Sequence, residues 1–422
     1  MEHIEKELKE GIKFHQIKTD KFKTNLVAIF LTTSLKRETV TQNALISSVL
    51  RRGTQNMPSQ ELISKELEEM YGAAFDCGLD KTGDNQVLKF YLETINDNFL
   101  PPLGENMWKV ATEKLLEIVF NPLVEQGGFK EEYVNQEKEN VKQRIEAKID
   151  NKAKYALDRC IEEMYKEEPF GLYKFGYVED LDKLNAKNLY EAYQQLIKHC
   201  KIDIFVSGIL NDDIENEVMQ NENIQKLQAR KPEYQIPNMQ LKKVEQEKVV
   251  TESMDVAQGK LVLGLDLAIE KEELRYHVML YNSILGGSAN SKLFQNVREK
   301  AHMAYVASSS YVRYKNNIFV NCGIEIENYE KALNLIKEQI EAMKKGDFTQ
   351  EEIENAKKGI ISGIQAIEDE QDTQVVYYYG QELSQYQMSI EQYKEKVMQV
   401  SKEDILAIAD KVTIDTIYFL KN

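Results

Sequence analysis

Apolar and polar residues alternate along the first half of the chain in patterns that predict strands and helices. Residues 26–31 form an apolar run, which predicts a buried strand. The apolar residues between 45 and 50 recur with helical spacing, which predicts an amphipathic helix. The other elements expected in this half are helices over 58–72, 107–120 and 130–147 and strands over 87–93 and 202–206.

The second half of the chain repeats this order of elements. It is expected to contain strands over 261–265, 318–326 and 416–420, helices over 276–285, 292–300 and 329–343, and a long helix that begins near 348. Corresponding positions, such as Leu50 and Leu285, lie about 215 to 235 residues apart. This order predicts an internal duplication.

The mixture of elements predicts an α+β fold with two homologous lobes, each a mostly antiparallel sheet packed with helices. Strands and helices do not alternate strictly as they would in a parallel α/β fold. The lobes are expected to cover residues 1–230 and 241–422. Residues 229–240 contain Pro232 and Pro237 and few apolar residues, which favours a linker there.

Composition excludes several functional classes. With 42% hydrophobic and 29% charged residues, the chain of 422 residues is globular and long enough for two domains. Its formal net charge of −16 argues against nucleic-acid binding, which needs a basic surface. An acidic surface favours solubility, although it could also attract cationic peptides.

The expected location is the cytoplasm. Residues 1–13 are charged and lack an apolar core, so no signal peptide is expected. No window approaches 18 consecutive apolar residues, so no membrane span is expected. The four cysteines show no Cys-x-x-Cys spacing, which is typical of reduced thiols: Cys77, Cys160, Cys200 and Cys322.

Four local strings connect the chain to a known family. They are LRRGT at 50–54, ELEEMYGAAF at 66–75, EKENVKQRI at 137–145 and LGGSANSKLFQNVREKAHMAY at 285–305. Together with the duplication, these strings resemble the insulinase/pitrilysin zinc peptidases, especially their processing-peptidase-like members. The resemblance covers essentially the whole chain, and the last string is its most specific part.

Active members of that family carry His-x-x-Glu-His on a helix just before the first string. Two histidines four residues apart share a helical face and bind one Zn²⁺, and the glutamate activates the bound water. The matching positions here are Ala44, Ser47 and Ser48. None of these side chains supplies an imidazole ligand or a carboxylate base.

The family's third zinc ligand is a glutamate seven residues after another glutamate. Here Glu137 matches the first glutamate, but the ligand position is Arg144, whose fixed positive charge would repel Zn²⁺. No pair of the five histidines is separated by four residues. The resemblance therefore implies a degenerate zinc site, with no metal or other cofactor in this chain and zinc only in an active partner.

Two residues of the second lobe match positions that hold substrate in the family. Arg298 and Tyr305 keep the family's separation of seven, and the resemblance implies that they bind the substrate backbone and stabilise the oxyanion. The alternative is structural: Arg298 would pair with Glu299 at a helix end, and Tyr305 would be an ordinary half-buried aromatic residue at the start of a strand.

Two further segments are candidate substrate contacts. Gly286, Gly287 and Ser288 match a glycine-rich segment that helps substrate entry in processing-type relatives, although a tight turn is the simpler interpretation. Residues 73–77 match the edge strand to which family substrates add as an extra strand. The candidate contacts there are Ala73, Ala74 and Phe75, in what could equally be a plain structural strand.

The leading hypothesis is a non-catalytic, peptide-binding subunit of a heterodimeric zinc peptidase. The resemblance implies two half-shell chains around a chamber, in which Arg298 and Tyr305 would act on zinc held by a homologue with an intact His-x-x-Glu-His motif. One alternative is a peptide-binding or scaffolding homodimer without hydrolysis. Another is an active peptidase that uses an unrecognised metal site.

Overall fold

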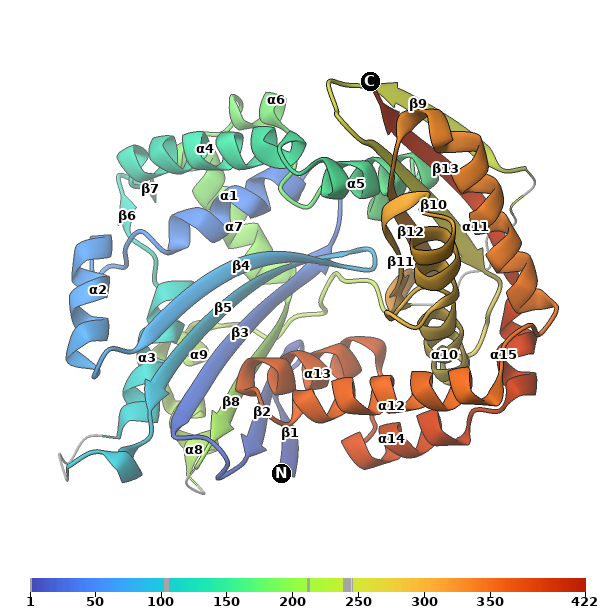
Figure 1. Cartoon of the computed structure of the whole chain (residues 1–422). Helices are drawn as coiled ribbons and strands as arrows, with labels where there is room; N and C mark the ends of the chain where they lie inside the picture. The colour runs from blue at the N-terminus through green and yellow to red at the C-terminus, as the bar shows by residue number, and fades with distance from the viewer. Residues whose placement is uncertain (1, 102–105, 211–212, 238–243, 245) are drawn as a thin grey trace. The chain divides into compact units, whose positions relative to one another are not determined.

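The computed structural model describes residues 2–101, 106–210, 213–237, 244 and 246–422 (Figure 1). The chain divides into two compact units, each with its own sheet. Unit 1 contains residues 1–146, 172–235 and 370–380, and unit 2 contains residues 147–171, 236–369 and 381–422.

The sheet of unit 1 has six strands in the order β1-β2-β8-β3-β5-β4. Its strands are β1 (Glu2–Lys9), β2 (Ile12–Lys18), β3 (Thr24–Ser34), β4 (Ala74–Thr82), β5 (Asn85–Ile95) and β8 (Lys201–Gly208). Only β2 and β8 pair in parallel, and every other pair is antiparallel. β1 and β4 are therefore the edge strands of this sheet.

Helices cover one face of this sheet and form the core of unit 1. Alternate residues of β3, such as Val27, Ile29 and Leu31, are fully buried in one cluster with apolar side chains of α1, α3 and α7. The other elements outside the sheet are α1 (Val40–Leu50), α2 (Gln60–Glu69), α3 (Met107–Phe120), the hairpin β6 (Val124–Glu125) and β7 (Gly128–Phe129), α4 (Glu131–Glu146), α6 (Val178–Leu181), α7 (Ala186–His199), α8 (Ile214–Gln220) and α9 (Glu222–Lys226).

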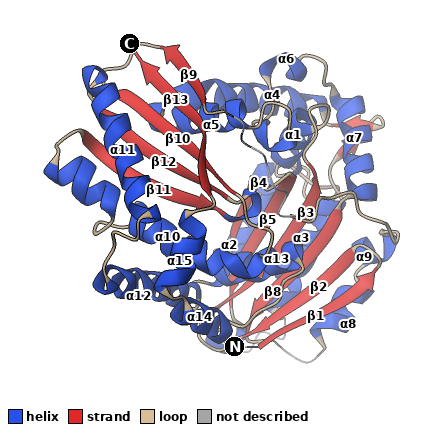
Figure 2. Ribbon diagram, turned by 90° about the vertical axis from the view of Figure 1, so that its right-hand side faces the viewer, coloured by secondary structure: helices blue, strands red, loops and turns tan. Residues whose placement is uncertain are grey.

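Unit 2 repeats this sheet with one strand fewer. Its order is β9-β13-β10-β12-β11, and again only one pair, β9 with β13, is parallel (Figure 2). The strands are β9 (Lys248–Ser253), β10 (Gly259–Leu267), β11 (Ala304–Val312), β12 (Asn317–Ile324) and β13 (Val412–Lys421). The helices are α10 (Arg275–Leu285), α11 (Tyr329–Lys344), α12 (Gln350–Ile367), α14 (Ile390–Gln399) and α15 (Lys402–Ala409).

The matching strand orders, with β1 as an addition in unit 1, confirm the predicted duplication and the α+β fold. The expected strand over 318–326 ends at Ile324, because a 3₁₀ turn occupies Ile326–Asn328. The helix expected over 292–300 is a π-helix, Leu293–Lys300. The structure adds β1, β2 and β9, which the sequence pattern did not predict.

Each half of the chain contributes one helix to the other unit. The α5 helix (Lys152–Met164) belongs to unit 2, where Cys160 and Met164 join a cluster with Val262 and Tyr418. The first part of α13 (Gln371–Ser384) belongs to unit 1. The units therefore differ in these two segments from the lobes expected at residues 1–230 and 241–422.

The α13 helix lies on the face of the unit 1 sheet opposite the core helices (Figure 1). The Tyr379 ring stacks on Phe30 with centroids 4.2 Å apart, and its hydroxyl lies 2.8 Å from Thr32 Oγ1. At the start of the helix, Gln371 Nε2 donates to the Ser207 carbonyl at 3.2 Å. Stacking and hydrogen bonds thus fix this helix on the sheet.

The expected linker is partly attached to unit 1. The backbone N–H of Glu233 donates to the His199 carbonyl at 2.8 Å, and Gln235 N–H donates to Asn85 Oδ1 at 2.7 Å. Residues 238–240 lie outside the described part of the chain. All four cysteines are free thiols. Within the described residues, no helix is both long and apolar enough to cross a membrane.

Candidate functional site

Helix α1 holds three of the altered zinc positions inside unit 1. Ala44, Ser47 and Ser48 are all buried, and Ala44 is part of the unit's apolar core. Ser48 Oγ donates to the Ala44 carbonyl at 3.4 Å, and Cys77 Sγ donates to the Ser47 carbonyl at 3.8 Å. These positions share one helical face, as zinc ligands would, but their neutral groups bond locally.

Helix α4 packs against α1 and carries Glu137, which matches the first glutamate of the family's zinc-ligand pair. Glu137 is 6% exposed, and its carboxylate accepts hydrogen bonds from Arg52 Nη1 at 3.3 Å and Asn140 Nδ2 at 3.1 Å. The Arg52 guanidinium also lies 5.1 Å from the centroid of the Tyr133 ring. A cation and an amide therefore already satisfy this carboxylate.

Arg144 stands on the same helix at the position of the third zinc ligand. Its side chain is exposed, and the guanidinium lies 5.2 Å from the centroid of the Phe175 ring. Burial raises the pKa of the neighbouring Cys77 thiol, and the Arg51 and Arg144 charges oppose that rise. At neutral pH the free thiol is therefore mainly protonated. The helices bring the four altered positions together without creating a replacement zinc site.

The structure assembles metal-ligating side chains elsewhere in unit 1. Among the described residues, the group of three that could hold an ion is His3, Glu5 and His15, on β1 and β2. This group was not predicted from the sequence, because the expected ligand pattern was two histidines four residues apart on a helix. The detectable signal was His-x-Glu on one strand, but the contribution of His15 depends on the register of the hairpin.

The candidate substrate strand is an edge strand. β4 pairs with β5 alone and ends the sheet order of unit 1. Ala74 is exposed, whereas Ala73 and Phe75 are partly buried against the core. An edge strand can accept an added peptide strand through its backbone groups. That Ala73, Ala74 and Phe75 contact a peptide stays a prediction.

The glycine turn follows α10 and is attached to β11. The Ser309 N–H donates to the Gly286 carbonyl at 2.8 Å. A Cβ on Gly286 would lie 2.6 Å from the Ser309 nitrogen, and one on Gly287 would lie 3.0 Å from Ser283 Cα. Close backbone packing therefore accounts for glycine at 286, which agrees with the structural interpretation of this turn.

Gly287 and Ser288 also line a pocket in unit 2, with a volume of about 450 Å³. Arg275 and Arg313 line the same pocket, and Glu272 accepts hydrogen bonds from both guanidinium groups, at 2.5 and 2.6 Å. The pocket thus combines cationic groups with the hydroxyl-bearing turn. This combination was not predicted from the sequence, because the two arginines come from separate elements.

Arg298 lies in the π-helix before β11. Its side chain is 42% exposed, its Nε lies 3.4 Å from a carboxylate oxygen of Glu299, and its guanidinium lies 4.5 Å from the centroid of the Phe294 ring. The ion pair with Glu299 is the contact that the structural alternative expects. Exposed pairs of this kind contribute little stability, so a substrate could displace the contact.

Tyr305 is the second residue of β11, an edge strand of the unit 2 sheet. It occupies a bulge, because Ala304 pairs with Ile324 while Val306 pairs with Gly323. The Tyr305 side chain is exposed, and its hydroxyl donates to Glu325 at 2.8 Å. This hydrogen bond raises the pKa of the phenol, which stays protonated and able to donate at neutral pH. Among described contacts, none joins Tyr305 to Arg298 directly.

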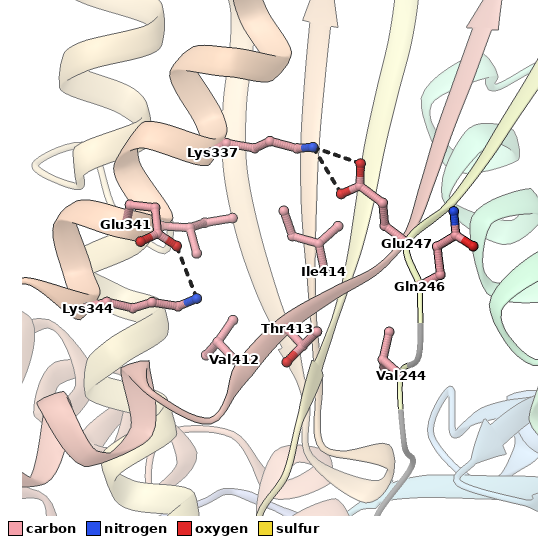
Figure 3. Close-up of a pocket in the computed structure, with 10 residues that line it drawn as sticks. Val244, Gln246, Glu247, Lys337, Glu341, Lys344, Val412, Thr413 and Ile414 are labelled. Atoms are coloured by element: carbon pink, nitrogen blue, oxygen red, sulfur yellow. Dashed lines mark hydrogen bonds and ion pairs between the residues drawn. The ribbon is translucent and has the colours of Figure 1, made fainter.

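A second pocket of unit 2, about 400 Å³ in volume, contains none of the predicted residues (Figure 3). Lys337 reaches from α11 to Glu247, with its Nζ 2.9 and 3.0 Å from the two carboxylate oxygens (Figure 3). Lys344 pairs with Glu341 on the same helix at 3.1 Å. The charged groups in these two pairs of the pocket thus neutralise one another.

Comparison with known proteins supports the resemblance. The sequence profile described as Peptidase M16 inactive domain matches residues 183–360. The probable inactive metalloprotease YmfF of Bacillus subtilis (strain 168) is 35% identical over 412 residues, which cover 97% of this chain and 96% of that protein.

Solved structures agree with this assignment. A conserved protein from Enterococcus faecalis V583 has a TM-score of 0.90 and 29% identity, with 100% of this chain and 98% of that chain covered. A peptidase M16 inactive domain from Pseudomonas fluorescens has the same fold, with a TM-score of 0.79, 15% identity, and coverage of 100% and 98%. The chain therefore belongs to the M16, or insulinase/pitrilysin, family of peptidases, as an inactive member with a degenerate zinc site.

Proposed function

We propose that this chain is the non-catalytic, peptide-binding subunit of a heterodimeric zinc peptidase. The observation that carries the proposal is an asymmetry between the two units. The former zinc site in unit 1 holds only neutral or cationic side chains at Ala44, Ser47, Ser48 and Arg144. In unit 2 the matched cation and phenol, on Arg298 and Tyr305, are exposed.

In the proposed complex, Arg298 and Tyr305 act on a carbonyl group bound to the partner's zinc. Developing negative charge on the carbonyl oxygen is stabilised by a fixed cation and a neutral hydroxyl donor. The raised pKa of Tyr305 keeps its proton in place. The local partners Glu299 and Glu325 are surface carboxylates, so exchanging them for a substrate oxyanion costs little.

The peptide itself would bind as an extra strand along the edge of β4. This mode depends on backbone hydrogen bonds, so it survives the loss of zinc ligands. The exposed Ala74 leaves room for a peptide side chain beside it. We place the subunit in the cytoplasm, in keeping with the free thiols of its four cysteines.

The test is reconstitution with a homologue that carries an intact His-x-x-Glu-His motif. The chain, the homologue and an equimolar mixture are compared by size-exclusion chromatography with light scattering and by cleavage of quenched peptides. We expect the mixture to form a heterodimer and to cleave the peptides, and we expect a chelator to abolish this cleavage. Neither this chain nor the homologue should cleave the peptides on its own.

Two other outcomes would contradict the proposal in different ways. A stable homodimer that binds peptide but ignores every intact homologue would instead support a scaffolding function. Chelator-sensitive turnover by the isolated chain would support an active peptidase with its own metal site.

A further inference from the structure

The hairpin of β1 and β2 brings two histidines and a carboxylate to one face of the unit 1 sheet. Glu5 stands directly opposite His15 in the antiparallel register, and His3 lies two residues before Glu5 on the same face of β1. One ligand atom from each of the three side chains lies within 4.8 Å of the other two. The strand register therefore creates the cluster.

His15 has the surroundings of a metal-binding histidine. It is fully buried, and its Nε2 lies 3.2 Å from Asp203 Oδ1. Asp203 also pairs with Lys201. Because Nε2 is directed at this carboxylate, His15 Nδ1 is directed away from Asp203. Carboxylates orient metal-binding imidazoles in this way.

The two imidazoles have a separation suited to a shared ion. His3 Nε2 lies 3.3 Å from His15 Nδ1. Two nitrogens about 2.0–2.1 Å from a tetrahedral centre are themselves about 3.3–3.4 Å apart. To bind one ion, each imidazole would have to turn its lone pair by about 35° away from the line between the two nitrogens. Glu5 is exposed, so its carboxylate has room to rotate inward as the third ligand.

Aromatic side chains hold both rings in place before any ion binds. The His15 ring stacks on Phe205 with centroids 4.1 Å apart, and the His3 ring stacks on Tyr378 of α13 at the same distance. Ligands whose orientations are fixed by packing lose little entropy when they bind a metal. The cluster is thus better ordered than a chance group of surface histidines.

We propose that His3, Glu5 and His15 form a binding site for a divalent transition metal such as Zn²⁺, with water completing its coordination. Two imidazoles and one carboxylate favour zinc, nickel or copper over calcium and magnesium, which prefer all-oxygen sites. In the metal-free chain, His3 Nε2 and His15 Nδ1 share a hydrogen bond. Metal binding replaces this hydrogen bond with two nitrogen–metal bonds, and the shared hydrogen moves to the other nitrogen of its imidazole or to water.

Two lysines pair with carboxylates at or next to the proposed site. Lys13 lies 3.8 Å from Glu5 and competes with a metal for its carboxylate. Lys201 pairs with Asp203, the carboxylate that His15 contacts, and balances its buried charge. The ion would therefore join β1, the outermost and most exposed strand, to the buried part of the sheet. Its proposed role is structural and separate from the α1–α4 region.

The experiment uses the full chain with Co²⁺ and Zn²⁺ as probes. We expect one equivalent of Co²⁺ to give visible absorption bands of a nitrogen- and oxygen-ligated ion, and Zn²⁺ to displace it. His3→Gln and Glu5→Gln change exposed or partly exposed side chains and should weaken binding at least about tenfold. His199→Gln, which changes a partly exposed histidine outside the cluster, should leave binding unchanged.

Hydrogen–deuterium exchange gives an independent readout of the structural role. Zn²⁺ should slow amide exchange in peptides covering residues 2–18 of the parent chain and should have no such effect in His3→Gln. Failure to bind either metal below about 1 mM would overturn the proposal, as would equal affinity in His3→Gln, Glu5→Gln and the parent chain. Cleavage assays play no part here, so this outcome is independent of the heterodimer.

Discussion

Arg52 Nη1 lies 3.3 Å from the buried carboxylate of Glu137. In an active relative, a zinc ion would bind in this region and would need negatively charged groups around it. This ion pair joins the end of α1 to α4. A cation from the protein itself thus takes the role of counter-ion for that carboxylate.

Removing this cation should destabilise unit 1. Arg52→Ala leaves Glu137 buried with only Asn140 as a partner, so the free energy of unfolding should fall by about 1–3 kcal/mol. Denaturant unfolding followed by circular dichroism measures the change. Arg51→Ala removes the same charge one residue away and should have a smaller effect. An equal loss in both variants would show that the pairing with Glu137 is not the cause.

Restoring the four altered positions should restore zinc binding. The variant Ala44→His, Ser47→Glu, Ser48→His, Arg144→Glu recreates the family's ligand pattern on α1 and α4. We expect one more zinc ion per chain than in the parent, by elemental analysis after gel filtration. Because Ala44 is in the packed core, the larger histidine should cost about 1–3 kcal/mol of stability.

The matched control retains Arg144. The triple variant Ala44→His, Ser47→Glu, Ser48→His has two imidazoles but keeps the guanidinium on α4, and it should bind zinc far more weakly. Equal zinc content in the triple and quadruple variants would mean that the position of Arg144 is not part of the former site.

The order of elements was predictable because the two halves have the same hydrophobic pattern. The first strand, β1, was missed because it is mostly exposed and charged, so its sequence carries no apolar alternation. The second strand of the hairpin, β2, was missed although it is mostly buried. The exchange of α5 and α13 was also missed. A local pattern shows that a helix has an apolar face, but it does not show which sheet that face contacts.

The exchanged helix α5 provides a test that depends on pH. Burial alone would raise the pKa of Glu252 on β9, but hydrogen bonds from Tyr155, Tyr418 and Arg159 outweigh it and hold the pKa below its ordinary value. This carboxylate therefore stabilises unit 2 above about pH 4.3. The contribution is lost as the pH falls through the lower, folded-state pKa.

Glu252→Gln should therefore lower stability at pH 7 and flatten the loss of stability on acidification. Thermal unfolding of the variant and the parent between pH 7 and pH 3 checks this. The stabilities of the variant and the parent, plotted against pH, should become equal toward pH 3. Parallel curves over the whole range would rule out a contribution from this carboxylate.

The cysteines should react in an order set by burial. Burial raises the pKa of Cys160, Cys200 and Cys322 to about 12, so only about one thiol in ten thousand is ionised at pH 8. Cys77 is only partly buried. Iodoacetamide labelling of the native chain, followed by mass spectrometry, should modify Cys77 first. The denatured chain gives the labelling rate of each cysteine when it is fully exposed. Labelling of the other three cysteines as fast as Cys77 in the native chain would contradict their burial.

Only part of the site could be predicted from the sequence. The altered positions followed from a sequence pattern, because ligand spacing on a helix is fixed. The pairing of Glu137 with Arg52 and the stacking of His15 on Phe205 depend on side-chain positions in the folded unit. No local sequence pattern determines either contact.

The most direct test of the central claim is the catalytic rate of a reconstituted heterodimer that carries Arg298→Ala. The account predicts that kcat/KM falls by about 10²–10³-fold, mainly through kcat, while the complex still assembles. Lys300→Ala, which removes another exposed cation from the same helix, should change the rate less than about twofold. Unchanged cleavage by the Arg298→Ala complex would contradict the claim that this chain supports catalysis on its partner's zinc.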